Sequence, residues 1–475
     1  MLTFLYFGDI IKESLERRSV SVLVKTIIEN YKSFDKKEEL SMISSSKMQR
    51  NKNHRVKIKQ TQLLKNAIVY GANASGKSNL VSAFAFIKQV LMEGLPVGSV
   101  NDFCRNKQEN KTRESIFELQ FTIGDTFYAY GFSVILSQRK ITEEWLYELM
   151  QDGGSRNLFM REGNQRPVLG EIVKPSSSDK SRFEVYAEDF VEQDDIHIRL
   201  FLTKMNLGKK YAANSKLRFF ADVFSWIMNN IIVINPNIGI SNTEAYYNDE
   251  SLDKISRLIQ TFDTGVTEIR TRKITIDEMG KMIPAEVVQG IFANLKTQMQ
   301  MRNLPGIQMT WRVNGGFFNI RIMENSEPEI TTLVLKHGKS VFDFNFSEES
   351  DGTQRLFDLI DMLLTDRNDT VMVVDELERS LHPKLTEHFL KLFMEAHENN
   401  RMQLVFTTHE DTIMDQSLFR RDEIWFVERN SDNASKIYSL DRFKERYDKK
   451  LSKAYLEGRY GAIPVFRQFS FRKGE

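Results

Sequence analysis

The sequence predicts an α/β fold, with a mixed sheet flanked by helices, an antiparallel β subdomain and a largely helical insertion. Two apolar runs predict the central sheet, because each ends in residues that suit phosphate or magnesium chemistry. A third observation predicts the insertion. Lys77 and Asp375, which follow these two runs, are 298 residues apart, so a large segment must separate the two strands of a compact sheet.

The first apolar run leads into a complete phosphate-loop motif. Residues 71–78 read Gly-Ala-Asn-Ala-Ser-Gly-Lys-Ser, with a strand-like run at 67–70 before them and a helix-like run at 79–87 after them. Such a loop points backbone N–H groups at phosphate oxygens, while its lysine reaches the β- and γ-phosphates and its last serine ligates Mg²⁺. The correct flanks disfavour the alternative, a chance glycine-rich turn. The predicted nucleotide-binding residues are Gly71, Ala72, Asn73, Ala74, Ser75, Gly76, Lys77, Ser78 and Asn79.

The second apolar run ends in two carboxylates. Residues 371–376 read Val-Met-Val-Val-Asp-Glu, which predicts a strand buried on both faces of a parallel sheet. Asp375 at its carboxyl end is placed to bind Mg²⁺ directly or through water, and Glu376 suits the orientation and deprotonation of an attacking water. A strand that merely ends in an acidic turn is the alternative. The phosphate loop favours a nucleotide hydrolase.

The order of the motifs around the acidic strand resembles that of ATP-binding-cassette (ABC) ATPases. Residues 349–355 (Glu-Ser-Asp-Gly-Thr-Gln-Arg) resemble the signature loop, and residues 377–383 (Leu-Glu-Arg-Ser-Leu-His-Pro) resemble the D-loop. His409 follows a strand-like run and resembles the switch histidine. The signature is degenerate, because Asp351 stands where the family has a glycine, and a plain helix N-cap at Ser350 is the alternative.

This resemblance implies a composite site for ATP and Mg²⁺. One head would hold magnesium with Ser78 and Asp375, and a second head would present its signature loop to the γ-phosphate. The implied trans signature residues are Ser350, Asp351, Gly352, Thr353 and Gln354, and the implied D-loop residues are Ser380, Leu381 and His382. The implied catalytic residues are Glu376, His409 and Lys77. The glutamine that completes the Mg²⁺ site in cassette ATPases could be Gln108 or Gln120.

Both ends of the sequence support a narrower resemblance. Residues 22–34 contain Asn-Tyr-Lys-Ser-Phe and resemble the opening of chromosome-maintenance and RecF-type ATPase heads, which implies that Lys32 lies near the nucleotide. Residues 455–464 (Tyr-Leu-Glu-Gly-Arg-Tyr-Gly-Ala-Ile-Pro) resemble the terminus of stand-alone bacterial ATPases of the abortive-infection type. That group, often called AAA_15 or AAA_21, includes AbiL/RloA-like ATPases and relatives of the OLD, Septu and PARIS ATPase subunits.

The sequence is compatible with three functions. The resemblance favours an anti-phage ATPase that dimerises head to head, or forms a larger oligomer, and controls a separate effector nuclease encoded nearby. A DNA-repair or recombination ATPase of the RecF/Rad50 type, acting on DNA, is the alternative. A transporter subunit is disfavoured by the degenerate signature and the large insertion. A basic strip could contact nucleic acid or form a solvated hairpin; it comprises Lys47, Arg50, Lys52, Arg55, Lys57, Lys59 and Lys65.

Composition limits the function classes further. The chain has 475 residues, with 66 Lys and Arg against 65 Asp and Glu, so charge alone gives no reason for nucleic-acid or membrane attraction. A lone cysteine, Cys104, excludes a disulfide framework and suggests a reducing cytosol. No apolar run approaches 18 residues and the first residues lack the features of a signal peptide, so we expect a cytoplasmic protein without a membrane span.

Four segments are expected along the chain. Residues 1–20 would form an N-terminal extension and residues 21–150 the first lobe of the head, with the phosphate loop and antiparallel hairpins. Residues 151–312 would form a mostly helical insertion, and residues 313–475 the second lobe. About 65 residues follow His409, fewer than the ~100 of an ordinary domain, so no nuclease domain is expected there.

Overall fold

The structure is a computed structural model of the chain. It describes residues 21–46, 48, 50–235, 249–301, 305–313, 316–324, 326–365, 367–443 and 450–464. The predicted extension at 1–20 and Lys47 of the basic strip lie outside these residues. The chain forms two compact units. The phosphate-loop unit comprises the described residues of Tyr6–Val233, Arg367–Glu376 and Glu398–Glu475, and the signature unit comprises those of Ile234–Asp366 and Leu377–His397.

A mostly parallel sheet organises the phosphate-loop unit. Its strand order is β11-β17-β18-β5-β19-β20, in which β17, β18, β5 and β19 are parallel and β20 is antiparallel to β19. The strands are β11 (Ile231–Ile234), β17 (Val371–Val374), β18 (Gln403–Thr407), β5 (Asn66–Tyr70), β19 (Ile424–Arg429) and β20 (Ser435–Ser439). Every residue of β5, β17 and β18 is buried, as the continuous apolar runs predict. The strands that position both carboxylates and the phosphate loop are therefore confirmed.

An antiparallel sheet forms the second layer of this unit. Its order is β10-β9-β8-β7-β6-β1-β2. The strands are β10 (Val168–Leu169), β9 (Ser155–Glu162), β8 (Lys140–Leu149), β7 (Thr126–Ile135), β6 (Ser115–Ile123), β1 (Leu23–Glu29) and β2 (Glu38–Ser41). The hairpin of β3 (Arg55–Ile58) and β4 (Thr61–Leu64) packs Ile58 and Leu63 against Val22 and Val24. The predicted alternating hairpins are thus present.

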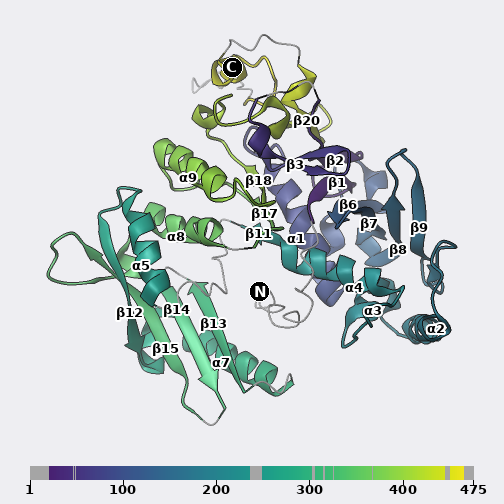
Figure 1. Ribbon diagram of the computed structural model, residues 1–475, viewed down its shortest axis with the longest axis horizontal. Helices are drawn as coiled ribbons and strands as arrows, with labels where there is room; N and C mark the ends of the chain where they lie inside the picture. The colour runs from purple at the N-terminus through teal and green to yellow at the C-terminus, as the bar shows by residue number, and fades with distance from the viewer. Residues whose placement is uncertain are drawn as a thin grey trace, which may run out of the picture. The chain divides into compact units, whose positions relative to one another are not determined.

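Helices complete the core of the phosphate-loop unit. They are α1 (Lys77–Glu93), α2 (Ser177–Val191), α3 (Phe201–Asn206), α4 (Arg218–Ser225) and α10 (Leu451–Leu456). One hydrophobic cluster joins apolar side chains of α1 to side chains from both sheets and from α2, α3 and α4. Figure 1 shows α3 and α4 beside the antiparallel strands. The helix that begins in the phosphate loop is therefore fixed by the main core.

The signature unit contains a second antiparallel sheet. Its order is β12-β15-β14-β13, with β16 beside β15. The strands are β12 (Val266–Ile274), β15 (Glu329–His337), β14 (Gly316–Met323), β13 (Gly306–Val313) and β16 (Phe344–Asn345), and the helices are α5 (Asp249–Gln260), α6 (Ile276–Met282), α7 (Ala285–Met301), α8 (Asp351–Leu364) and α9 (Pro383–Ala396). Helix α5 lies along edge strand β12 (Figure 1), where the Ile269 N–H donates to Ser256 Oγ at 3.0 Å. This contact satisfies a donor on the edge of the sheet.

Residues 151–312 contain more strand than the sequence predicts. Strands β9 and β10 extend the antiparallel sheet of the phosphate-loop unit, whereas β12 and β13 belong to the signature unit. The reason is clear at β12, an edge strand in which Arg270, Thr271 and Arg272 are all exposed in succession. Such a strand lacks the strict alternation that identifies a strand from sequence. The boundaries of the four expected segments remain predictions.

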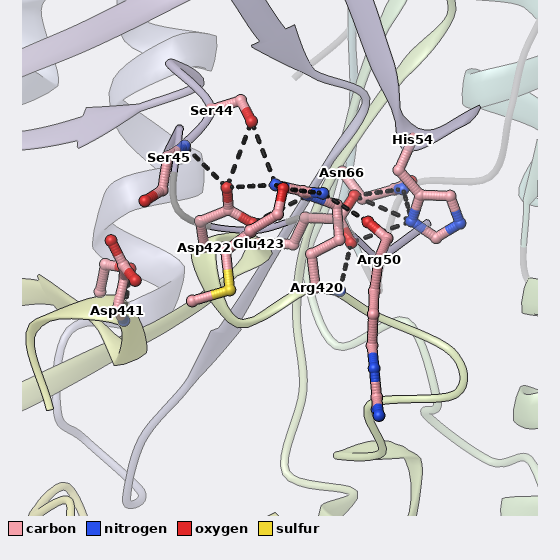
Figure 2. A network of polar contacts seen from close by, with 11 residues as sticks. Ser44, Ser45, Arg50, His54, Asn66, Arg420, Asp422, Glu423 and Asp441 are labelled. Carbon is pink, nitrogen blue, oxygen red and sulfur yellow. Dashed lines mark hydrogen bonds and ion pairs between the residues drawn. The ribbon is translucent and has the colours of Figure 1, made fainter. Parts of the chain in front are cut away.

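A buried polar network fastens the start of β5 to the segment before β19. Figure 2 shows Glu423 beside Asn66 and His54, with Nδ1 of His54 3.0 Å from Oε2 of Glu423 and Nδ2 of Asn66 2.9 Å from Oε1. The Glu423 carboxylate also accepts the Arg420 N–H at 2.8 Å. The Arg420 guanidinium in turn pairs with Asp422 at 2.8 Å. The network therefore stabilises the strand that leads into the phosphate loop.

Replacing Glu423 with alanine should destabilise the protein strongly. Glu423 has no exposed surface, and its removal leaves His54, Asn66 and a backbone N–H without their acceptor. Breaking such a buried set costs about 3–5 kcal/mol of unfolding free energy. Chemical denaturation of Glu423→Ala tests this, with Glu457→Ala as control because Glu457 makes a surface ion pair to Arg459. Equal stability of the two variants would contradict the expected role of the network.

Candidate functional site

The phosphate loop joins β5 to α1, as the motif requires. Gly76 precedes the helix with a φ of +116°, and a Cβ there would lie 2.4 Å from Ser435 Oγ and 2.6 Å from Ser33 Oγ. Two serines distant in sequence thus pack against the loop. The Ser33 Oγ accepts from Asn79 Nδ2 at 2.8 Å, and the Ser33 carbonyl accepts the Ser435 N–H at 2.7 Å. Only glycine fits this position, because the backbone is left-handed and the neighbours are close.

Lys77 is held where the motif predicts. Its side chain is only 5% exposed, and Nζ donates to the carbonyls of Gly71 at 2.8 Å and Ala72 at 3.3 Å. The next residue, Ser78, is exposed at the start of α1. Within the described part of the chain, the buried Oγ of Ser75 makes no hydrogen bond. A buried cation, an exposed hydroxyl and a spare polar group in one loop suit a phosphate ligand.

Asp375 and Glu376 share one threonine at the end of the neighbouring strand. The Thr407 Oγ1 donates to Asp375 Oδ1 at 2.6 Å and accepts the Glu376 N–H at 2.8 Å. Glu376 is half-buried and has a φ of +47°, which is rare for a residue with a side chain. Thr407 was not predicted as a site residue. The sequence signal that could have identified it is a threonine at the carboxyl end of a buried strand.

His409 lies beside Lys77. Its Nδ1 is 3.4 Å from the Lys77 Nζ, and it follows β18 by two residues. Partial desolvation and the charge of Lys77 lower the pKa of His409 below its ordinary value, although Glu376 and Asp375 oppose this. Lys77, Asp375, Glu376 and His409 therefore meet at the carboxyl ends of adjacent parallel strands, where ligands of such sheets bind.

The lowered pKa of His409 predicts a pH dependence. Protonation adds a second positive charge beside Lys77, so the neutral ring is the favoured form in the free protein. If neutral His409 is required for hydrolysis, kcat/KM should fall only below about pH 6.5, the ordinary histidine value, because kcat/KM reports groups of the free enzyme. A pH profile of ATP hydrolysis, compared with His409→Gln, measures this. An acid limb centred above that pH would contradict the assignment.

Lys32 contacts the phosphate-loop helix rather than the loop itself. Its Nζ donates to Ser82 Oγ on α1 at 3.0 Å, and its backbone N–H donates to the Asp102 carbonyl at 2.6 Å. The preceding Asn30 amide donates to the carbonyls of Asn110 and Arg113, each at 2.9 Å. The Asn-Tyr-Lys-Ser-Phe segment that follows β1 is therefore hydrogen-bonded to the segment after α1. The role of Lys32 toward nucleotide remains a prediction.

The signature loop and the D-loop meet within the signature unit. Ser350 caps α8 and accepts the Thr353 N–H at 3.1 Å, so the N-cap expected as an alternative is present. A Cβ on Gly352 would lie 2.7 Å from the Ser380 carbonyl, which places the two loops in contact. Among the predicted loop residues, the exposed ones are Ser350, Asp351, Ser380 and His382, the half-buried ones are Gly352 and Leu381, and the buried ones are Thr353 and Gln354.

The residues present fit Mg²⁺ bound together with nucleotide. No group of three or more His, Cys, Asp or Glu side chains in the described residues could hold a metal alone. Magnesium usually takes one or two protein ligands and completes its coordination with phosphate oxygens and waters. Ser78 and Asp375 would supply the protein ligands. Gln120 Nε2 donates to Glu118 Oε1 at 2.8 Å, and Gln108 begins the short 3₁₀ helix Gln108–Lys111. The glutamine that would complete the Mg²⁺ site remains a prediction.

The fold and the site define a P-loop ATPase head of the ABC type. A phosphate loop and an acidic strand on a mostly parallel sheet, beside an antiparallel β subdomain, carry this assignment and confirm the predicted fold class. Residues 67–415 match the AAA_21 family, described as "AAA domain, putative AbiEii toxin, Type IV TA system". The chain belongs to this family. The predicted family resemblance is therefore confirmed.

Solved structures of SMC heads are similar to this chain. One is an SMC head bound to the C-winged helix domain of ScpA, with a TM-score of 0.37 and 14% identity over 92% of this chain and 99% of that chain. The head from Thermotoga maritima gives 0.33 and 14% over 88% and 98%. A head with an extended coiled coil from Pyrococcus furiosus, bound to the C-terminal domain of ScpA, gives 0.34 and 15% over 93% and 99%. The comparison with curated proteins gave no match.

None of the helices in the described ranges is both long and apolar enough to cross a bilayer.

Proposed function

We propose that this chain is an ATPase whose active site is completed by a second copy. The observation that carries the proposal is the meeting of Lys77, Asp375, Glu376 and His409 beside the phosphate loop. The signature loop and D-loop expose Ser350, Asp351, Ser380 and His382 to solvent, which leaves them available to a partner head. ATP bound on one head would then join the two heads.

Each residue has a definite task in this proposal. Lys77 leaves the loop carbonyls and binds the β- and γ-phosphates, while Ser78 and Asp375 would hold Mg²⁺, which neutralises phosphate charge when bound. Glu376 orients a water and takes its proton as the water attacks the γ-phosphorus, and the bond to the bridging β–γ oxygen breaks. The neutral His409 ring hydrogen-bonds the γ-phosphate. Thr407 keeps the Asp375 carboxylate and the Glu376 backbone in position.

Ser350→Arg should separate binding from turnover. The arginine would project from the exposed start of α8 and block the approach of a partner's nucleotide, while every residue of the phosphate loop stays unchanged. We expect unchanged ATP affinity and turnover reduced at least about a hundredfold, the usual loss when a transition-state contact is removed. Nucleotide titration and phosphate release measure the two effects. An isolated chain unable to bind ATP would show that Ser350 does not act in trans.

The proposed biological role is anti-phage defence through a separate effector nuclease. The support is the family match, whose description names an AbiEii-type toxin system, together with the closing segment that resembles abortive-infection ATPases. Purifying Glu376→Gln from its native locus with ATP, followed by mass spectrometry, tests this role. A nuclease-like protein that co-purifies supports the gated effector. Nucleic acid without a protein partner favours repair instead.

A RecF-type role on DNA is the second candidate, and one surface feature favours it. Lys52, Lys57 and Lys59 of the basic strip are exposed, whereas Lys65 is buried and donates to the Glu398 carbonyl at 2.7 Å. The strip is thus only partly free to meet phosphates. Salt-sensitive stimulation of ATP hydrolysis by DNA is expected of this candidate and not of the defence role.

A further inference from the structure

The loop between strands β15 and β16 carries two exposed apolar side chains at its tip. The loop follows His337 and carries Val341 and Phe342, which are 89% and 82% exposed. No other large apolar side chain among the described residues is as exposed as these two. Single exposed apolar residues are ordinary, but two adjacent ones on a loop tip mark a candidate contact surface.

The base of this loop is fastened to the signature loop. Nε2 of His337 lies 2.6 Å from Oε1 of Glu349, the residue immediately before Ser350. The His337 ring packs edge-on against Phe344 with centroids 5.0 Å apart, and Phe344 pairs with Leu335 across the strands. The carbonyl of Glu349 accepts a hydrogen bond from the buried Gln354 side chain at 3.0 Å. The loop that carries Val341 and Phe342 is therefore joined to the signature loop through the contacts of His337 with Glu349 and Phe344.

The exposed surface of the signature loop and the D-loop offers little apolar area. Its exposed members are Ser350, Asp351, Ser380 and His382. The serines and the histidine can donate hydrogen bonds to phosphate, but all four side chains are polar and bury little hydrocarbon. A stable interface buries about 800 Å² per partner and has an apolar centre with a polar rim. Val341 and Phe342 supply apolar surface on a loop that is joined to the signature loop. We therefore expect this apolar surface to contact a second copy of the chain, the partner that approaches Ser350.

We propose that Val341 and Phe342 form an apolar contact with a second copy of this chain when two heads close on ATP. The inference rests on the proposed function and names a contact that the nucleotide does not supply. Burial of the two side chains on closing stabilises the dimer, and the His337–Glu349 contact aligns the tip with Ser350. Because both side chains are almost fully exposed in one chain, charged substitutions leave the fold of the isolated chain intact.

The experiment uses the slow variant Glu376→Gln as background and measures the dimer dissociation constant by sedimentation at saturating ATP. Adding Val341→Asp and Phe342→Asp should raise that constant at least about tenfold while ATP affinity stays within about twofold. Phe342→Leu in the same Glu376→Gln background, with Val341 unchanged, should keep the dimer dissociation constant close to that of Glu376→Gln, because leucine is also apolar. Val168→Asp, which changes a 59% exposed apolar residue of β10, is the matched control and should leave the constant unchanged.

The outcomes separate this inference from the proposed function. If Glu376→Gln dimerises with ATP and the aspartate variant dimerises equally well, the loop contact is wrong while the composite site stands. If Glu376→Gln itself remains a monomer with bound ATP, the composite site is wrong and this inference falls with it. A weaker dimer in the Val168→Asp control as well would also overturn it, because any new charge would then act in the same way.

Discussion

Glu376→Gln is expected to bind ATP as tightly as the wild type and to hydrolyse it about 10²–10⁴ times more slowly, the usual contribution of a general base. The amide keeps the size of the side chain, and the backbone N–H of residue 376 still donates to Thr407 Oγ1. It cannot accept the proton of the attacking water. Single-turnover phosphate release and nucleotide titration on the same preparation measure both quantities.

A nearby glutamate provides the matched control for Glu376→Gln. Glu410 follows His409 directly, and its carboxylate accepts the Thr412 N–H at 3.1 Å. Glu410→Gln retains an oxygen for that bond and should hydrolyse ATP at close to the wild-type rate. Wild-type turnover in Glu376→Gln would contradict the assignment of the base, and a large loss in Glu410→Gln would show that any charge change near His409 has the same effect.

Lys77→Ala is expected to abolish useful nucleotide binding. A hydrogen bond to a charged group is worth about 1.5–3 kcal/mol, and the ammonium can make more than one to the β- and γ-phosphates, so the Kd for ATP should rise about a hundredfold or more. The alanine also removes the contacts of Nζ with the Gly71 and Ala72 carbonyls. Equilibrium titration with a fluorescent ATP analogue measures the effect.

The control for Lys77→Ala must remove a lysine without touching the loop. Lys36, exposed in the turn between β1 and β2, meets this need. Lys36→Ala should bind ATP like the wild type, and thermal unfolding of both variants shows whether the fold survives. Unchanged ATP affinity in a folded Lys77→Ala protein would mean that the motif does not bind phosphate here.

The sequence predicted the elements that carry the nucleotide chemistry. The strands before Gly71 and Asp375 are uniformly apolar, so their burial in a parallel sheet followed directly. The alternating run that became β6 was equally clear, since Phe117, Leu119 and Phe121 are all buried. Local pattern was sufficient wherever a segment is buried on one or both faces.

Other features depend on contacts that a single sequence does not display. Thr407 bridges Asp375 and Glu376 only because β17 and β18 are parallel neighbours in a register that pairs Val374 with Phe406. Ser33 and Ser435 reach Gly76 from opposite ends of the chain. Strand β12 escaped detection for a different reason, because an edge strand tolerates charged residues in succession.

The most direct test of the composite site is the mass of Glu376→Gln in solution with and without ATP and magnesium. Light scattering on the eluting protein gives the mass, and one chain weighs 55.4 kDa. We expect a monomer without nucleotide and twice that mass with ATP, and Lys77→Ala should remain a monomer in both conditions. A monomer of Glu376→Gln that holds ATP at saturation would contradict closure of two heads on the nucleotide.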